Sequence, residues 1–337
     1  MTIRTLPTWL SMGLVIGIVW SAWLFGMVTG DRWELFADNW FMSVTMAFGS
    51  FIAGATSEGG GAVAFPVMTL FFGIEPATAR DFSLMIQAVG MTAAAVTILA
   101  TRIPVERRAL VWGSLGGAAG IILGLEFVAG RLSPPYAKML FMSTWLSFAV
   151  ALYLINRYHE REVHQGITHF LPRHALLLFG VGIVGGLISS ITGSGLDITI
   201  FSLLVLRLRI NEKIATPTSV VLMGINAAVG FLWKTSAGPG MAPAAWNYWW
   251  VCVPIVVVGA PFGAWFIKRR SRLFVAGILY TSIAIQFISA LIIVPMTPRL
   301  IGFSVAIFAV GIGLFRWMAS RGVKRLEWLT AEGHSPN

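Results

Sequence analysis

The chain has 337 residues, of which 57% are hydrophobic and only 11% are charged, and its mean hydropathy is +0.80. A water-soluble core of this size does not bury so much apolar side chain, so the composition indicates a membrane protein. The net charge of +10 does not indicate nucleic-acid binding, because the 24 lysine and arginine residues fall mostly in short gaps between apolar segments.

Eight apolar segments have about the length of one membrane crossing, which takes roughly 20 helical residues for a hydrocarbon core of ~30 Å. The first has no small-residue cleavage site, so we interpret it as a transmembrane helix rather than a signal peptide. The eight segments are 9–28, 79–101, 108–129, 137–156, 214–236, 248–267, 273–295 and 299–318.

Two further apolar segments, 43–73 and 175–208, are too long for one crossing and too short for two. Polar and glycine-rich sequences interrupt both segments near the middle. Backbone that leaves the helix at membrane depth must be buried in protein or face a water-filled cavity. Both segments are therefore predicted to be re-entrant or broken helical hairpins with deep tips. The interrupting sequences are Thr56-Ser57-Glu58-Gly59-Gly60-Gly61 and Thr192-Gly193-Ser194-Gly195-Leu196-Asp197.

The distribution of positive charge favours the re-entrant interpretation. If both segments return to the face they came from, 18 of the 24 lysine and arginine residues lie on the cytoplasmic side, against 15 if both cross once. The predicted fold is therefore an all-α polytopic membrane protein with about eight spanning helices, two hairpins and both termini in the cytoplasm. This count places Arg80 and Lys234 among the residues outside the cell.

The two hairpins also indicate an inverted repeat. Displacing the chain by 135 residues brings the two interruptions into register, and the hairpins enter from opposite faces, as in many secondary transporters. Each repeat would hold one hairpin and three spanning helices. The predicted division is an N-terminal helix and outside loop (1–42), repeat 1 (43–156), a cytoplasmic linker (157–174), repeat 2 (175–295), and a C-terminal helix with a basic cytoplasmic tail (296–337).

The sequence Gly54-Ala55-Thr56-Ser57-Glu58-Gly59-Gly60-Gly61, followed by Pro66, a turn with Pro76 and a degenerate second copy, resembles the TauE/SafE family. The resemblance covers roughly residues 43–318. It implies export of sulfite or small organosulfonates across the bacterial inner membrane. Glu58 stands where the family more often has a small or apolar residue, and the second copy carries Asp197 with fewer glycines. Because of these departures, the resemblance is a weaker guide to the substrate than to the fold.

The chemistry of the tips independently favours an anion. A half-helix that starts at membrane depth presents unpaired N–H groups and a partial positive charge, here at 59–61 and 194–196. The alternative is that the glycines serve close packing of the tips, and that the polar residues of the following helices bond between helices. The predicted substrate-binding residues are Thr56, Ser57, Gly59, Gly60, Gly61, Ser83, Gln87, Thr192, Gly193, Ser194, Gly195, Ser219 and Asn226.

A carboxylate at membrane depth is costly, so Glu58 or Asp197 is a candidate for proton coupling. No catalytic residue, metal or cofactor is expected, and the expected partners are a small anion, the bilayer and a coupling proton or ion. The alternatives are an importer, a channel, or an intramembrane serine hydrolase, which lacks a histidine at the depth of Ser194. The oligomeric state, the exact substrate and the direction of transport stay open.

Overall fold

The computed structural model describes residues 8–56, 58–156, 164–167, 170–267, 270 and 272–331. Within these ranges the chain forms twelve α-helices and two π-helices, which confirms the predicted all-α class. In chain order they are α1 (Thr8–Thr29), α2 (Leu35–Ala55), α3 (Gly59–Pro66), η1 (Val67–Phe71), α4 (Pro76–Ala100), α5 (Arg107–Phe127), α6 (Pro134–Asn156), α7 (Pro172–Thr192), α8 (Leu196–Ser202), η2 (Leu203–Arg207), α9 (Glu212–Ser236), α10 (Pro243–Ile267), α11 (Arg272–Ile293) and α12 (Pro298–Ala331).

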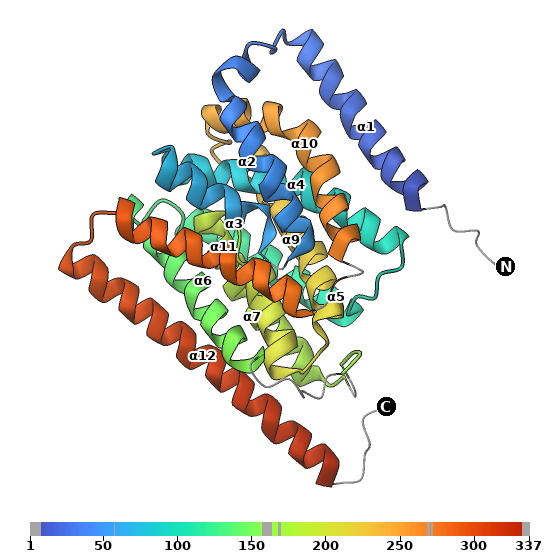
Figure 1. Cartoon of the computed structure of the whole chain (residues 1–337), viewed down its shortest axis with the longest axis vertical. Coiled ribbons are helices and arrows are strands. Elements are labelled where there is room, and N and C mark those ends of the chain that lie inside the picture. The colour runs from blue at the N-terminus through green and yellow to red at the C-terminus, as the bar shows by residue number, and fades with distance from the viewer. Residues whose placement is uncertain are drawn as a thin grey trace, which may run out of the picture.

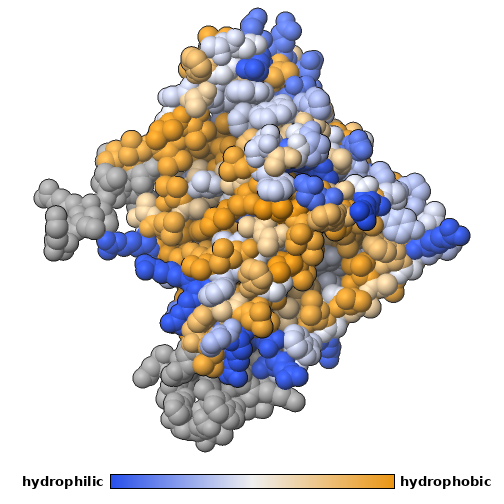
Figure 2. Space-filling view, turned by 180° about the vertical axis from the view of Figure 1, so that it is seen from behind, coloured by the Kyte–Doolittle hydropathy of each residue, from blue (hydrophilic) through white to orange (hydrophobic). Residues whose placement is uncertain are grey.

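The outer surface is suited to lipid. Among the described residues, nine helices are long and apolar enough to cross a membrane: α1, α4 to α7 and α9 to α12. Large apolar side chains are exposed on these helices, such as Ile18 at 67% and Val310 at 69%. In Figure 2 the middle of the visible molecular surface is mostly hydrophobic, and hydrophilic residues lie towards its edges. Such a surface is a liability in water and is expected in a bilayer. The chain is therefore a multi-pass integral membrane protein.

The first hairpin consists of α2, α3 and η1. Helix α2 runs parallel to α10, because Ser43 bonds the carbonyl of Val251 at 2.9 Å and Gly54 packs further along on Ala260. The helix ends at Ala55, and α3 then runs back along α4, with Gly61 beside Ser83. The return confirms that this segment is re-entrant.

The second hairpin consists of α7, α8 and η2, and it enters from the opposite face. Helix α7 runs parallel to α5, since Gly116 packs on Phe179 and Gly120 packs on Ile183. Helix α8 turns back along α5, with Leu196 beside Gly117. Because α5 begins at the face where α4 ends, the two hairpins point towards each other.

Elements α2 to α6 and α7 to α11 follow the same order. Helix α7 begins 137 residues after α2, and α9 begins 136 residues after α4. The displacement of 135 residues that brings the two sequence repeats into register is therefore one or two residues too small. Each hairpin packs on a helix of the other series: α2 on α10, and α7 on α5. Helices α1 and α12 lie on opposite sides of this core (Figure 1).

Two faces can be distinguished by their side chains. We call one the basic face, where α4 ends and α5, α7 and α9 begin, and the other the tryptophan face, where α2, α4 and α10 begin. On the tryptophan face Arg32 lies over the ring of Trp250 at 4.6 Å, and Trp40 near the start of α2 is exposed, as expected of an interfacial belt. The basic face carries Arg102, Arg107, Arg108, Arg173, Arg207, Arg209, Lys213 and Arg270.

Helix α2 begins at Leu35, eight residues before the apolar segment from which it was predicted. The additional residues include Asp38 and Trp40, which are exposed. Interfacial residues of this kind extend a helix beyond the hydrocarbon core, where hydropathy no longer marks it. The division into five sequence regions stays a prediction.

Candidate functional site

The two hairpin tips meet inside the protein. We call them tip 1 (56 and 58–61) and tip 2 (192–197), and their contact the tip junction. The hydroxyl group of Ser194 donates a hydrogen bond to the Glu58 carbonyl at 3.1 Å. Gly59 has a φ of +71°, and a Cβ on it would lie 2.6 Å from Oε1 of Gln87 and 3.1 Å from Oγ of Ser194, and would also run into the Asp197 carboxylate. Glycine is therefore required at position 59 by its backbone conformation and by the space available.

Gln87 of α4 joins the second tip to the core. Its Nε2 atom donates to the Gly193 carbonyl at 2.7 Å and to the Ser83 carbonyl at 2.9 Å, whereas its Oε1 atom has no partner among the described residues. The Ser83 hydroxyl bonds the Ala79 carbonyl of its own helix. Gln87 thus holds tip 2, and Ser83 supports it by packing.

The amide groups of the second tip already have partners within the chain. The Asp197 carboxylate accepts hydrogen bonds from Gly195 N at 3.1 Å, from Ile198 N at 2.9 Å and from the Ser194 hydroxyl at 3.1 Å. Leu196 N bonds the hydroxyl of Ser189 at 3.1 Å. The expectation of unpaired amides at both tips is therefore wrong for tip 2, because an aspartate in the first turn of a half-helix caps it.

Thr192, at the end of α7, also bonds within the chain. Its hydroxyl donates to the Ser194 carbonyl at 2.7 Å and contacts the Ile188 carbonyl at 3.2 Å. Together with Asp197 it closes tip 2 into a turn with all its hydroxyl groups engaged. Tip 2 is a preformed structural unit in this conformation.

The first tip is less satisfied. Thr56 donates to the Ile52 carbonyl and accepts from Glu58 N at 3.2 Å. Gly59 N and Gly60 N donate to no partner among the described residues. Both carboxyl oxygens of Glu58 are buried without a hydrogen bond from the described part of the chain, although Ser282 of α11 faces the group. Ser57 lies outside the described residues.

Ser219 and Asn226 of α9 are buried but do not join the tip junction. The Ser219 hydroxyl donates to Thr216 of its own helix at 2.8 Å. Asn226 lies beside Gly117 of α5, and neither of its side-chain polar atoms has a partner in the described ranges. The tips therefore gather most, but not all, of the residues predicted from the sequence.

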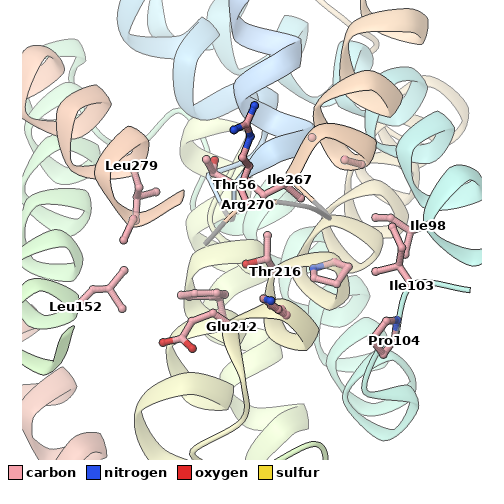
Figure 3. Close-up of a pocket in the computed structure, with 16 residues that line it drawn as sticks. Thr56, Ile98, Ile103, Pro104, Leu152, Glu212, Thr216, Ile267, Arg270 and Leu279 are labelled. Atoms are coloured by element: carbon pink, nitrogen blue, oxygen red, sulfur yellow. The ribbon is translucent and has the colours of Figure 1, made fainter. Parts of the chain in front are cut away.

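A cavity of about 160 Å³ leads from the basic face to tip 1. It is smaller than the roughly 300 Å³ typical of sites for drug-sized ligands, so it suits a small solute. Figure 3 shows Thr56 and Arg270 on one side of the space, Glu212 and Thr216 on another, and apolar walls between them. The apolar walls are formed by Ile98, Ile103, Pro104, Leu152, Phe201, Ile267 and Leu279.

A charged cluster on the other side of the tips was missed by the sequence analysis. Arg80 and Lys234 both bind the carboxylate of Asp81, and all three are buried, with at most 7% exposed. The sequence analysis counted both cations among the residues outside the cell and did not predict their burial, which arises because each lies within a helix, α4 or α9, and beneath the 237–242 segment. Their burial could have been inferred from the sequence, because Arg80 and Lys234 lie inside the apolar segments 79–101 and 214–236.

No group of three or more histidine, cysteine, aspartate or glutamate side chains suited to a metal occurs in the described ranges. The Ser194 hydroxyl is engaged with Glu58 and Asp197, and His174 lies at the opposite end of α7. The Ser194 hydroxyl therefore serves the contact between the two tips and has no histidine base beside it among these partners.

The comparison with known families gives one match. Residues 41–287 match the family model described as sulfite exporter TauE/SafE. The matched range includes the second hairpin, the first hairpin without the first six residues of α2, the tip junction and the charged cluster. No curated protein and no solved structure matches the chain.

Proposed function

Because this chain belongs to the TauE/SafE family of sulfite exporters, we propose that it is a secondary transporter that moves sulfite or a small organosulfonate out of the cytoplasm. The observation that carries the proposal is a small cavity that reaches tip 1 from the basic face. The tip junction beyond it is fully buried, with Thr56, Glu58 and Ser194 all at 0% exposure. A path open at one face and closed at the other supports a carrier rather than an open channel.

The first tip offers the groups that an oxyanion needs. Helix α3 begins at Gly59, and the amides of Gly59 and Gly60 point from the positive end of the helix dipole with no competing partner in the described residues. The Thr56 hydroxyl lies at the end of the cavity, and Lys213 and Arg270 line its wall. An anion would enter past the two cations and bind at these amides, and the Thr56 hydroxyl would donate to it after turning its proton away from the Ile52 carbonyl.

The opposed hairpins support alternating access. Each hairpin packs on a helix of the other series, so movement of one series against the other would open the junction towards the tryptophan face. The structure then corresponds to the conformation open to the basic face. The positive-inside rule supports a cytoplasmic location for this face, and with it the proposal of an inner-membrane protein with both termini in the cytoplasm.

Glu58 is the better candidate for proton coupling. Asp197 accepts three hydrogen bonds and caps α8, whereas Glu58 has none from the described residues. A buried carboxylate without such bonds is costly, so a group of this kind exchanges a proton when its surroundings change. In Glu58→Gln, transport should lose its response to a pH gradient, whereas unchanged coupling would contradict this role.

The direct test is flux of sulfite and of small sulfonates in proteoliposomes. We expect saturable flux that responds to a counter-gradient, and the sign of that response separates export from import. Thr56→Val should lower kcat/KM about tenfold, since a hydrogen bond to a charged ligand contributes ~1.5 kcal/mol or more. Thr144→Val is a matched control, because that hydroxyl bonds only its own helix at Leu140. Absence of wild-type flux for all these anions would contradict the proposal.

A further inference from the structure

The cluster of Arg80, Asp81 and Lys234 holds two cations and one carboxylate in a buried environment. Oδ1 of Asp81 accepts from Nε and Nη2 of Arg80 at 3.0 and 2.8 Å, and Oδ2 accepts from Nζ of Lys234. The described surroundings add no second acid to the pair of cations. One positive charge is therefore uncompensated, although burial of an unpaired charge is unfavourable.

The cluster adjoins the tip junction on the side away from the cavity. A Cβ on Gly193 of tip 2 would lie 2.9 Å from the Arg80 carbonyl oxygen. Gln87, which bonds Gly193, lies two turns along the same helix. An anion that leaves the tips towards the tryptophan face thus meets Arg80 and Lys234 next.

The segment 237–242 covers the cluster on the tryptophan face. Gly238 packs on the backbone of Lys234, Gly240 N bonds the Lys234 carbonyl at 2.9 Å, and Ala242 N donates to Oδ2 of Asp81 at 2.9 Å. The covering segment therefore contacts the cluster at the backbone of Lys234 and at one carboxylate oxygen of Asp81. A group that displaces Asp81 would have to take over its bond to Ala242.

We propose that this cluster is a second anion site on the exit side of the tips, in which the Asp81 carboxylate stands in for the substrate while the site is empty. The proposal rests on the function proposed above. A sulfonate or sulfite carries three oxygens around one centre, and two of them can take the places of Oδ1 and Oδ2 against Arg80, Lys234 and Ala242 N.

The test removes the excess charge without leaving Asp81 unpaired. In Arg80→Gln and in Lys234→Gln, Asp81 keeps one cation and the Ala242 amide, so both variants are expected to fold. If one of the two glutamine variants does not fold, the other is sufficient for the test. Each variant removes one positive charge, Arg80 beside Oδ1 of Asp81 and Lys234 beside Oδ2. Arg80→Lys and Lys234→Arg conserve the charge and serve as matched controls.

In proteoliposomes, each glutamine variant should lower kcat for sulfite at least tenfold while KM on the cavity side changes less than twofold. The charge-conserving variants should retain most of the rate. A cluster that only locked the helices would give an unchanged or faster rate on neutralisation, and that result would overturn the second site. Wild-type protein without anion flux would overturn the proposed function and this site together, whereas wild-type flux with unaffected glutamine variants overturns this site alone.

Discussion

The two hairpin tips have the same construction but differ in how their polar groups are used. In tip 2, Asp197 and Ser189 satisfy the amide groups at the start of α8. In tip 1, the amides of Gly59 and Gly60 and the carboxyl group of Glu58 have no hydrogen bonds from the described residues. The two repeats thus differ: the amide donors of tip 2 are hydrogen-bonded within the chain, whereas those of Gly59 and Gly60 in tip 1 have no partner among the described residues.

This difference assigns separate roles to the two hairpins. A satisfied polar turn is stable and preorganised, whereas buried donors without partners are costly unless a ligand supplies the missing bonds. Tip 1 also ends the cavity that opens on the basic face, through Thr56. We therefore regard tip 1 as the substrate-facing tip and tip 2 as its support.

The largest expected difference between the two tips is in the contribution of their carboxyl groups, Asp197 and Glu58, to stability. Asp197→Ala leaves the buried amides of Gly195 and Ile198 without an acceptor and should lower the free energy of unfolding by about 3 kcal/mol. Glu58→Ala, the matched control, removes no hydrogen bond from described residues and should change it by less than about 1 kcal/mol. Denaturation in detergent measures both. Equal losses in the two variants would show that the tips do not differ.

A methyl group at the tip junction should have the next largest effect. Gly59→Ala combines a left-handed backbone with a Cβ 2.6 Å from Gln87, so we expect a loss of about 2 kcal/mol and severely reduced anion flux. In Gly60→Ala the nearest atom is Cγ of Gln87 at 3.5 Å, and stability should be retained. Thermal unfolding and flux test the pair, and equal tolerance of both would contradict the tight junction.

Gln87 tests the difference between the tips because it packs against both of them but, of the two, donates a hydrogen bond to tip 2 only. Gln87→Leu removes the donor to the Gly193 carbonyl, with an expected loss of ~1 kcal/mol and slower transport. Gln286→Leu is the control, since that side chain bonds Ser282 within α11. Flux and thermal unfolding of both variants check this. Retained transport in Gln87→Leu would mean that tip 2 stays in place without this bond.

Asn226 should give the smallest effect on stability. Its polar atoms have no partner in the described chain, so Asn226→Leu should alter the free energy of unfolding by less than about 1 kcal/mol. The informative measurement is flux in this variant beside Ser219→Ala. If flux falls while stability is retained, Asn226 belongs to the substrate path, and if neither changes, it does not.

Much of this architecture is predictable from the sequence. Glycine-rich interruptions in two apolar segments of unusual length identify the hairpins, and the residues Gly59, Gln87 and Ser194 are expected near the tips from the sequence. The capping role of Asp197 was missed, although an acidic residue three positions after Ser194 is a typical cap signal.

The charged cluster was harder to predict. Arg80 and Lys234 stand near the ends of their helices, where hydropathy does not separate a buried charge from an interfacial one. Only the folded position of 237–242, with Ala242 bonded to Asp81, shows that they are covered. That contact joins residues 161 positions apart in the chain, and no local pattern encodes it.

The most direct test of the opposed hairpins is the sidedness of introduced cysteines. With Cys252, the chain's single cysteine, replaced by alanine, impermeant reagents would be applied to each side of variants at Asp38, Glu75, Arg173 and Lys213, all of them exposed. Asp38 and Glu75 flank the first hairpin and should label from one side, and Arg173 and Lys213 flank the second and should label from the other. Labelling of Asp38→Cys and Glu75→Cys from opposite sides would contradict the re-entrant path and the tip junction that depends on it.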